Sequence, residues 1–461
     1  MKARACGSAS RSGANGLLLL VHEDGYAAGR SGRGRWRVRG NGRRSGRRRW
    51  RVRGNSYHSG SGRWQRSSDR IKMMRRIYFD NNATTPLLPE VLAAMQPYWL
   101  ESFGNASSIH QQGQQARSAV ENAREQVAGL LGARTSEIVF TSGGTEGDNL
   151  ALSGLVQPGD HVISSAIEHH AVLNSCKRLE EMGVAVTYVG CDANGVVQPE
   201  AVRAALRPET RLISVMMANN ETGALQPVEA IGEIAREADA YFHTDAVQAA
   251  GKVAIDVERI GCDVLTVAAH KMHGPQGVGA LYVRRGTLLR AMQVGGRHER
   301  GRRAGTENLP GIVGFGKAAE MAQEWLASGG DRRMSAMRDH LEERICKAVE
   351  SARVNSAAAQ RVPNTSNIWF DGIEGEGFVI AMDLKGVSVS TGAACSSGAI
   401  EPSHVLTAMG IGEGARGSIR FSLGKQNTAE EVEQVLSLVP EVVSKLRELS
   451  PVWIEKLAGK L

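Results

Sequence analysis

Residues 137–148 read Glu-Ile-Val-Phe-Thr-Ser-Gly-Gly-Thr-Glu-Gly-Asp: an apolar run, then a glycine-rich turn, with an apolar helical stretch following. A buried strand that passes through glycines into a helix is the repeating unit of α/β domains. More apolar runs follow, separated by helical patterns such as Val228 to Ala238. The predicted strands are Glu137–Phe140, His161–Ser165, Arg211–Met217, Tyr241–Thr244, Asp263–Ala268 and Gly279–Val283. This order predicts an α/β fold with a mainly parallel sheet.

The pattern changes near residue 330 to a long helix, a few strands and a final helix over Thr428–Leu449. We therefore expect a large domain over residues 88–327. We expect a smaller α+β domain built from residues 77–87 and 328–461. Pro86 and Pro89 mark the place where the chain enters the large domain.

Residues 1–76 differ from the rest in charge. They hold 21 Lys and Arg against 3 Asp and Glu, a net charge of +18, whereas the remainder carries −10. This Arg-, Gly- and Ser-rich composition predicts disorder. Three explanations stay open: an RNA-binding arm in which Trp36, Trp50 and Trp64 stack on bases, a transit peptide for an organelle, or a non-native start before Met73 or Met74. Nucleic-acid binding is not expected of the acidic body.

Membrane and disulfide-dependent classes are disfavoured. The longest apolar run in residues 1–76, Leu17 to Val21, is far shorter than the ~20 residues of a membrane helix. Six cysteines are scattered along the chain, at positions 6, 176, 191, 262, 346 and 395, with no CxxC pair. A chain of this size does not need disulfides, so we expect a reducing compartment, the cytoplasm, and no membrane partner.

Two motifs sit where strands end. Gly143-Gly144-Thr145-Glu146 opens a helix, and free N–H groups at a helix start favour phosphate. The alternative is an ordinary turn capped by Thr145. Lys271, in Ala269-His270-Lys271-Met272-His273-Gly274-Pro275, follows an apolar strand, where a partly desolvated amine suits Schiff-base chemistry. The alternative is a surface lysine in a Gly-Pro turn.

Two further motifs carry a carboxylate and a thiol. Asp245, followed by Gln248, ends a strand and could pair with a protonated ring nitrogen of a pyridoxal cofactor. The alternative is a helix-capping aspartate. Cys395 lies in Thr391-Gly-Ala-Ala-Cys-Ser-Ser-Gly398, where small neighbours predict a mobile loop and an exposed, nucleophilic thiol. The alternative is a small core residue.

This combination resembles the cysteine desulfurases of the NifS/IscS type, within the class V, pyridoxal-phosphate-dependent aminotransferase superfamily. The likeness runs from about residue 78 to residue 453. Further motifs that carry it are Tyr78-Phe-Asp-Asn-Asn-Ala-Thr-Thr-Pro86, Gly104-Asn-Ala-Ser-Ser108, Glu168-His169, Asn219-Asn-Glu-Thr-Gly223, Gly301-Arg-Arg-Ala-Gly-Thr-Glu-Asn308 and Ile419-Arg-Phe-Ser-Leu-Gly424. The resemblance implies the type I fold of pyridoxal-phosphate enzymes, with a seven-stranded sheet, and a homodimer.

The resemblance also implies roles around the cofactor, pyridoxal 5′-phosphate. Lys271 should bind it covalently and later move the Cα proton. Asp245 should pair with the ring nitrogen, and Gln248 should donate to the ring hydroxyl. His169 should stack on the ring and act as an acid–base group, since imidazole titrates near neutral pH.

Other implied roles concern the phosphate and the substrate. Gly144, Thr145 and His270 should hold the phosphate, and Thr306 should reach the phosphate bound by the partner subunit. Arg420 should clamp the substrate carboxylate through its planar fork, with Asn220 assisting at the cofactor and the substrate.

The implied reaction converts L-cysteine to L-alanine and leaves a persulfide on Cys395. The sulfur would pass to an iron–sulfur scaffold protein or to tRNA thiolation, and Cys395 could ligate a transient iron–sulfur cluster at the scaffold interface. The alternative enzymes are a selenocysteine lyase or a class V aminotransferase. Two positions depart from the family pattern: Ala268 replaces a phosphate-binding Ser, which puts the affinity for the cofactor in doubt, and Ala106 replaces a Pro.

Overall fold

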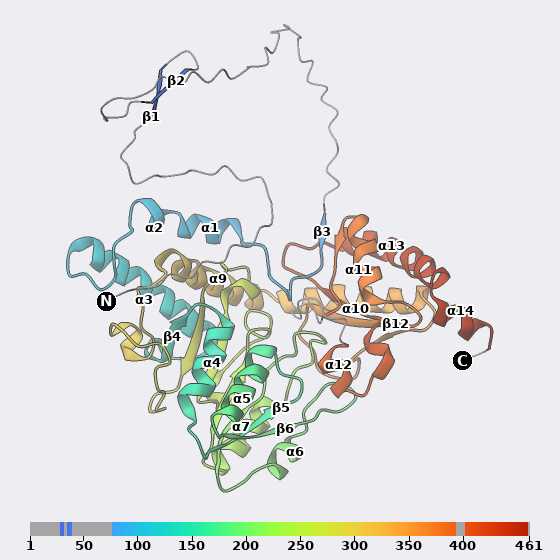
Figure 1. Ribbon diagram of the computed structural model, residues 1–461, viewed down its shortest axis with the longest axis horizontal. Coiled ribbons are helices and arrows are strands. Elements are labelled where there is room, and N and C mark those ends of the chain that lie inside the picture. The colour runs from blue at the N-terminus through green and yellow to red at the C-terminus, as the bar shows by residue number, and fades with distance from the viewer. Residues whose placement is uncertain (1–27, 32–34, 39–75, 393–401, 460–461) are drawn as a thin grey trace, which may run out of the picture. The chain divides into compact units, whose positions relative to one another are not determined.

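The computed structural model describes residues 28–31, 35–38, 76–392 and 402–459 (Figure 1). The chain divides into two compact units, residues 1–70 and 71–461. In the first unit β1 (Ala28–Ser31) pairs antiparallel with β2 (Arg35–Val38). The alternating Arg-Trp-Arg-Val sequence of β2 is typical of a strand, and the predicted disorder of residues 1–76 stays a prediction. The rest of the predicted extension, apart from Arg76, lies outside the described residues.

The second unit is built on a seven-stranded sheet with the order β4-β10-β9-β8-β7-β5-β6. Neighbouring strands are parallel except at β10, which runs antiparallel to both β4 and β9. The predicted α/β fold with a mainly parallel sheet is confirmed. The strands are β4 (Ile138–Thr141), β5 (His161–Ser165), β6 (Ala185–Val189), β7 (Thr210–Ser214), β8 (Tyr241–Asp245), β9 (Val264–Ala268) and β10 (Gly279–Val283).

The strand predicted over Arg211–Met217 is too long, since β7 ends at Ser214. The main-chain N–H of Met216 donates instead to the Glu168 carboxylate, at 2.8 Å. The Glu168 side chain takes the place of a strand neighbour on this side, whereas the N–H groups of Val215 and Met217 still donate to His243 O and Asp245 O of β8.

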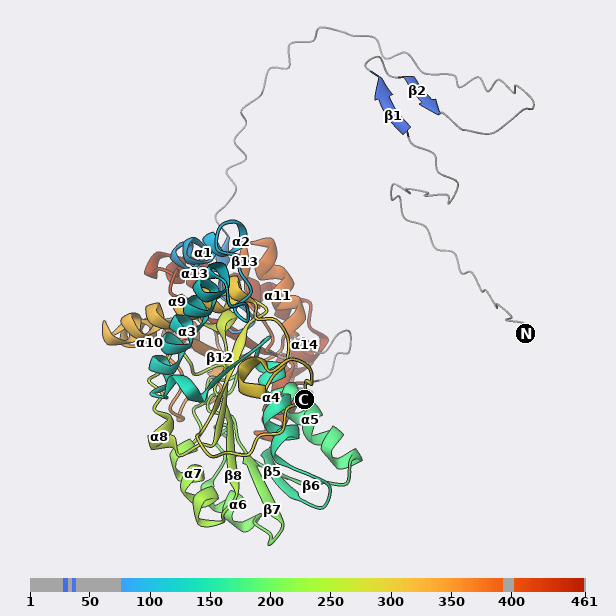
Figure 2. The same cartoon turned by 90° about the vertical axis from the view of Figure 1, so that its left-hand side faces the viewer.

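Both faces of the sheet are covered by helices. Figure 2 shows α4 and α5 on one side, and α3, α7 and α9 on the other. The long hydrophobic stripes of these helices pack on strands that are buried on both faces, as parallel strands are. The helices of this region are α1 (Pro89–Met95), α2 (Pro97–Leu100), α3 (Gln111–Leu131), α4 (Gly144–Leu155), α5 (His170–Glu181), α6 (Pro199–Ala204), α7 (Val228–Glu237), α8 (Val257–Ile260) and α9 (Leu309–Ala327).

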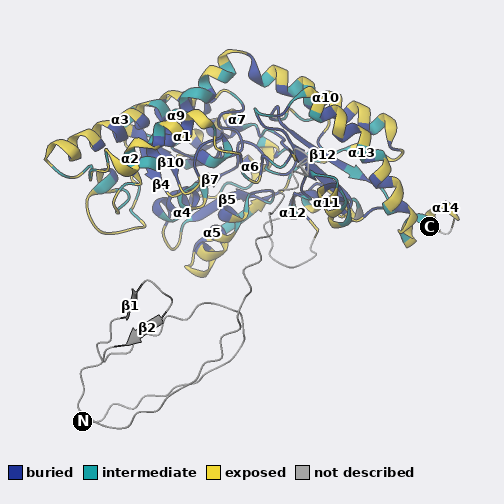
Figure 3. Cartoon of the chain, turned by 90° about the horizontal axis from the view of Figure 1, so that it is seen from above, coloured by how far each residue is buried: buried dark blue, intermediate teal, exposed yellow. Residues whose placement is uncertain are grey.

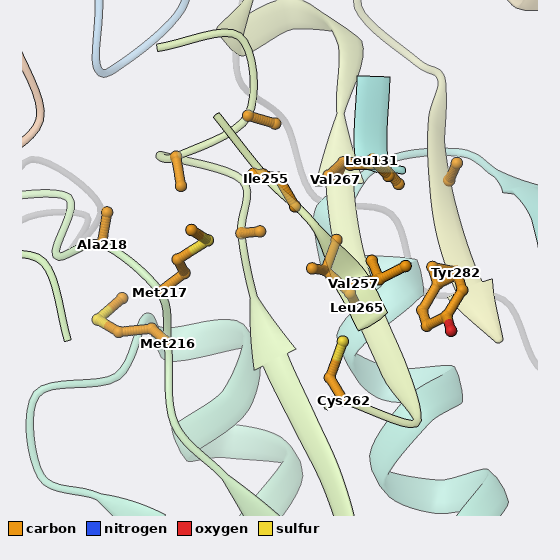
Figure 4. Packing of buried hydrophobic residues seen from close by; sticks show 14 of the residues in the cluster. Leu131, Met216, Met217, Ala218, Ile255, Val257, Cys262, Leu265, Val267 and Tyr282 are labelled. Carbon is orange, nitrogen blue, oxygen red and sulfur yellow. The ribbon is translucent and has the colours of Figure 1, made fainter. Parts of the chain in front are cut away.

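Alternate residues of each strand belong to different hydrophobic clusters. On β9, Val264 packs with the α4–α5 side, whereas Leu265 and Val267 pack with the α3 side. Figure 4 shows Leu265 and Val267 near Tyr282 of β10 and Leu131 of α3. Figure 3, which is coloured by burial, shows buried strands between helices whose outer faces are exposed. The two clusters fix the register of the sheet, because a one-residue slip would exchange its faces.

A third cluster lies apart and joins β3 (Ile77–Tyr78) to elements after residue 330. It surrounds an antiparallel sheet of order β11-β12-β14 and the parallel pair β13-β3. The helices and strands in this part of the chain are α10 (Gly330–Ala348), β11 (Ala352–Val354), β12 (Thr365–Phe370), α11 (Gly375–Leu384), β13 (Val387–Ser388), α12 (His404–Ala408), β14 (Ser418–Ser422), α13 (Ala429–Glu448) and α14 (Pro451–Leu457). Val405 and Leu406 of α12 pack with the large cluster instead. The two-domain division of this unit stays a prediction.

Four short 3₁₀ helices complete the described part: η1 (Thr135–Glu137), η2 (Ala269–Lys271), η3 (His298–Gly301) and η4 (Gly412–Ala415). No helix in the described ranges has both the length and the apolar character needed to cross a membrane.

A buried ion pair ties α3 to β4 and to the segment that carries Thr306. Arg124 Nη1 lies 2.6 Å from Glu299 Oε2, and Arg124 Nη2 lies 2.9 Å from Glu299 Oε1. Glu299 Oε2 also accepts the main-chain N–H of Phe140, at 2.9 Å. The carboxylate therefore holds three separate segments together.

We expect Arg124→Met to lower the free energy of unfolding by about 3–5 kcal/mol, because it leaves the Glu299 charge buried without its partner. Urea denaturation followed by circular dichroism measures this loss. The control is Arg203→Met, which breaks an exposed 2.7 Å pair with Glu237 and should cost less than about 1 kcal/mol. Equal losses in the two variants would contradict the structural role of the buried pair.

Candidate active site

Lys271 lies at the carboxyl end of β9, in η2, and is held by main-chain carbonyls. Its Nζ donates to Asn82 O at 2.6 Å and to Ala83 O at 2.8 Å. These carbonyls belong to the segment that follows β3, 188 and 189 positions earlier in the chain. The alternative of a plain surface lysine is therefore disfavoured, because its amine is tied to a distant segment.

Asp245 ends β8, next to β9 in the sheet, and is buried. Its Oδ1 accepts the main-chain N–H of Val247 at 2.8 Å, and no helix begins there in the described structure. The helix-capping alternative is thus excluded. Burial, then the neighbouring Asp148, raises the pKa of Asp245 to about 7, while Lys271 acts in the opposite direction. This carboxyl would be stabilised as an anion by a cation placed beside it.

His169 precedes α5, and its Nδ1 accepts the main-chain N–H of Ala171 at 3.1 Å. Burial, then the charge of Lys271, lowers the pKa of His169 to about 4. The expected titration near neutral pH is therefore wrong for this environment, and the imidazole is neutral at pH 7. Because Nδ1 accepts a hydrogen bond, the ring proton sits on Nε2. The ring of the next residue, His170, contacts the ring of His404, with 4.8 Å between ring centres and a tilt of 44° between the ring planes.

The glycine-rich turn gives α4 an open amino end. Its N-cap, Gly143, provides no side-chain cap, so the first N–H groups stay available to an anion. A Cβ on Gly144 would lie 2.8 Å from Val247 Cγ2, so only glycine lets the turn approach the segment after β8. Thr145 is exposed at this end of the helix. This geometry favours phosphate binding over a Thr145-capped turn.

The other two residues predicted to bind phosphate lie at the same edge of the sheet. His270 Nδ1 is 3.1 Å from Thr84 Oγ1, and burial and Lys271 lower the pKa of His270 to about 4. Thr306 is exposed and lines a pocket together with Thr141 and Ser142, which immediately precede the glycine turn. Its predicted contact with a partner subunit stays a prediction.

Arg420, on β14, is 3% exposed and reaches toward the Asn82 segment. Its Nη1 donates to Asn220 O at 3.0 Å and its Nη2 to Asp80 Oδ1 at 2.8 Å. Arg420 Nε and Asn220 Oδ1 are both buried without a hydrogen-bond partner in the described structure. Buried polar atoms are nearly always satisfied, so these two atoms mark a place for a polar ligand.

Sequence reasoning missed Asn82, which makes hydrogen bonds to three predicted site residues, Lys271, Gln248 and Asn220. Its main-chain O accepts from both Lys271 and Gln248, and its Nδ2 donates to Asn220 O at 3.1 Å. The signal was present as Asn81-Asn82 inside the motif over residues 78–86. Gln248, predicted to face the cofactor hydroxyl, donates here to Asn82 O at 3.0 Å.

Comparisons with known proteins agree with this arrangement. Residues 77–435 match the family model described as aminotransferase class-V. A cysteine desulfurase IscS of Methanosarcina thermophila is 49% identical over 382 residues, which are 82% of this chain and 94% of the relative. A cysteine desulfurase IscS of Anaeromyxobacter sp. (strain Fw109-5) is 50% identical over 385 residues, 82% of this chain and 95% of the relative.

Solved structures give the same result. A NifS-like protein superposes with a TM-score of 0.75 at 39% identity, covering 80% of this chain and all of that protein. A structure described as SspA in complex with cysteine has a TM-score of 0.68 at 38% identity, covering 76% of this chain and all of SspA. The chain belongs to the cysteine desulfurase family. The predicted resemblance to the NifS/IscS type and the predicted type I fold are confirmed.

Cysteine desulfurases use pyridoxal 5′-phosphate, and the residues of this family member fit that group. The open amino end of α4, with Gly144, Thr145 and His270, suits the phosphate. Buried Asp245 suits a protonated ring nitrogen, and the Lys271 amine suits the aldehyde. The described residues contain no group of three or more His, Cys, Asp or Glu arranged to hold a metal ion.

Cys395, the predicted catalytic cysteine and possible cluster ligand of this desulfurase, lies outside the described residues, as does most of the loop predicted around it. The described residues on either side, Gly392 and Ser403, both meet buried Glu221. Ser403 Oγ donates to Glu221 Oε2 at 2.5 Å, and a Cβ on Gly392 would lie 3.1 Å from the same atom. Glu221 follows Asn220 in the sequence, so Gly392 and Ser403 both lie near the segment that contacts Arg420.

The four cysteines within the described residues are poor nucleophiles. Burial raises the pKa of Cys176 to about 12 and that of Cys191 to about 11, and it raises the pKa of Cys262 and Cys346 as well. All four are therefore protonated thiols at neutral pH.

Ala268, the departure from the family pattern, lies buried under the glycine turn. Its Cβ is 3.9 Å from the position of a Cβ on Gly144. Thr266 does not replace the missing hydroxyl, because its Oγ1 contacts His243 Nε2 at 3.1 Å. The phosphate site of this desulfurase therefore lacks one side-chain donor.

We expect Ala268→Ser to tighten binding of pyridoxal phosphate about tenfold, because it adds a hydrogen bond to a charged group. Titrating the cofactor-free protein with pyridoxal phosphate and following tryptophan fluorescence measures the dissociation constant. Ala280→Ser, the same change at a buried position of β10, is the control and should leave the constant unchanged. An unchanged constant for Ala268→Ser would show that the missing hydroxyl does not limit affinity.

Proposed function

We propose that this desulfurase converts L-cysteine to L-alanine and leaves the sulfur on Cys395 as a persulfide. The observation that carries this proposal is a pair of buried polar atoms, Arg420 Nε and Asn220 Oδ1, which lack hydrogen-bond partners in the described structure. A ligand with a carboxylate and an amino group, as in an α-amino acid, would satisfy an arginine donor and an amide acceptor. The SspA structure described as a complex with cysteine supports cysteine as that amino acid.

Each nearby side chain has a task in the reaction. Pyridoxal phosphate, when bound, supplies a carbonyl that binds amines and a ring that accepts an electron pair. Lys271 takes and returns the proton at the substrate Cα, from a position set by the carbonyls of Asn82 and Ala83. His169 is neutral and can donate through Nε2. Asp245 provides the negative charge at the end of β8.

The sulfur step needs a thiolate and no external oxidant. Cys395 Sγ forms a bond with the substrate Sγ while the substrate Cβ–Sγ bond breaks, and the Cβ carbon takes a proton to become the methyl group of alanine. The sum of L-cysteine and one protein thiol equals alanine and one protein persulfide. The positions of Gly392 and Ser403 at Glu221, beside Asn220, support Cys395 in this role.

We also propose a homodimer and an external sulfur acceptor. Thr306 is exposed on its own chain, which leaves it available to a second copy. The acceptor is an iron–sulfur scaffold protein or a tRNA-thiolation partner, and Cys395 is the residue that would share a transient cluster with a scaffold. A selenocysteine lyase or a class V aminotransferase remains the alternative, and a requirement for Cys395 separates them, since an aminotransferase needs no nucleophilic thiol.

Cys395→Ala tests the sulfur step. We expect the release of alanine and sulfide from L-cysteine, in the presence of a reducing thiol, to fall about a hundredfold or more, because the persulfide acceptor is gone. The visible absorbance of the bound cofactor should stay intact. Cys346→Ala, at a half-buried thiol on α10, is the control and should keep full turnover. Equal turnover in Cys395→Ala and the unmodified protein would favour the lyase or the aminotransferase.

Arg420→Lys tests the substrate pocket. We expect the KM for L-cysteine to rise roughly 10–100-fold with a smaller change in kcat, because lysine cannot form the paired hydrogen bonds of a guanidinium to a carboxylate. Steady-state kinetics at several cysteine concentrations measure both constants. Arg353→Lys, an exposed arginine on β11 of the same sheet, should behave like the unmodified protein. A KM that stays constant would remove Arg420 from substrate binding.

A further inference from the structure

Lys252 is a buried lysine that no step of the proposed reaction uses. It lies four residues after Gln248 in the sequence, and it is 6% exposed. Its Nζ donates to Gln248 Oε1 at 2.6 Å and to Asn82 Oδ1 at 3.1 Å. A buried amine is costly unless it is hydrogen-bonded, so these two acceptors are what hold it in the interior.

The hydrogen bonds of Lys252 close a ring of three residues, Lys252, Gln248 and Asn82. Gln248 Nε2 donates to Asn82 O at 3.0 Å, while Lys252 binds the other end of both residues. The same Asn82 oxygen accepts Lys271 Nζ at 2.6 Å. Any movement of Lys252 is therefore transmitted to the carbonyl that positions Lys271.

We propose that Lys252 is a positioning residue of the cofactor site: it fixes the orientation of the Gln248 amide and the place of Asn82, and through them the Lys271 amine. This inference rests on the proposed function, since it concerns how that site holds pyridoxal phosphate.

The orientation of the amide follows from the donor at Lys252. An amine donor requires the Gln248 oxygen on its side, so Nε2 must point the other way, toward Asn82 O and the site. A flipped amide would place two donors against each other and would offer an acceptor to the cofactor hydroxyl. Lys252 thus decides that Gln248 donates to the cofactor.

The charged groups around this ring define the expected electrostatic effect. Burial, then Lys271 and Arg420, lowers the pKa of Lys252. Across the site, the charge of Lys271 acts on His169, His270 and Asp245. Because the charged form of Lys252 is disfavoured, its effect on the site is carried by the hydrogen bonds that it donates to Gln248 and Asn82.

The test uses the enzyme with bound pyridoxal phosphate and the variant Lys252→Met. We expect the apparent pKa of the visible absorbance band of the Lys271-bound cofactor to rise by about one unit, because Gln248 is no longer oriented to donate a hydrogen bond to the cofactor oxygen. We expect the dissociation constant for the cofactor to weaken about tenfold. Absorbance titrations from pH 6 to 10 and fluorescence titrations measure these two quantities without reference to turnover.

Lys425→Met is the matched control. Lys425 is also a largely buried lysine, burial lowers its pKa to about 8, and it lines the same small cavity as Lys252 and Lys271. No hydrogen bond joins its Nζ to Gln248 or Asn82 in the described structure. Its loss should lower stability but should leave the absorbance titration unchanged. A shift in both variants would show that any buried lysine has the effect and would overturn the proposal.

A double-mutant cycle with Gln248→Met tests whether Lys252 acts through Gln248. We expect the shift in the double variant to be smaller than the sum of the two single shifts, since the residues work as one unit. Additive shifts would contradict positioning. If Lys252→Met does not fold, Lys252→Gln is the second variant. It keeps a hydrogen-bond donor without the charge and should retain most of the cofactor affinity. A loss of cofactor affinity equal to that of Gln248→Met would overturn the proposal.

The two proposals fail in different ways. An unmodified protein that forms no visible band with pyridoxal phosphate would contradict the proposed function. A normal band whose titration is the same in Lys252→Met would contradict the positioning role alone.

Discussion

The main-chain oxygen of Asn82 is the point on which the site depends. It accepts hydrogen bonds from Lys271 Nζ and Gln248 Nε2. These two residues follow β9 and β8 of the seven-stranded sheet. Two residues earlier, Asp80 binds Arg420 of the three-stranded sheet at 2.8 Å. The short segment after β3 therefore sets the distance between the amine that handles the cofactor and the guanidinium that we assign to the substrate. Its own place is fixed by hydrogen bonds to both sheets, which explains why so little chain can carry this constraint.

Burial at the carboxyl edge of the sheet controls which groups carry charge. It raises the pKa of Asp148 and Asp245 to about 7 and that of Glu168 to about 8. It lowers the pKa of His169 and His243 to about 4. Neutral imidazoles cannot balance a carboxylate, so a protonated ring nitrogen beside Asp245 would be a strong partner for its anion. The interior beside Asp245 is therefore suited to a ring with a protonated nitrogen.

The fold was predictable where burial is uniform. His161–Ser165 and Gly279–Val283 were predicted with their observed bounds, and all five residues of each strand are buried. β6, with exposed positions, gave no comparable signal. Lys271 was predictable because a lysine at a strand end is chemically unusual. Asn82 was not, because its key group is a main-chain carbonyl, which every residue has, and its partner lies 189 positions away.

A protein that carries sulfur on one cysteine must keep that sulfur from its other thiols. Transfer between thiols depends on the thiolate fraction of the acceptor. With a pKa of about 11, the Cys191 thiol is ionised to only about one part in 10⁴ at pH 7, and that of Cys176 even less. Both are placed by packing that a small apolar residue could also provide. Burial therefore makes the thiols of Cys176 and Cys191 poor acceptors for the sulfur that we propose Cys395 carries.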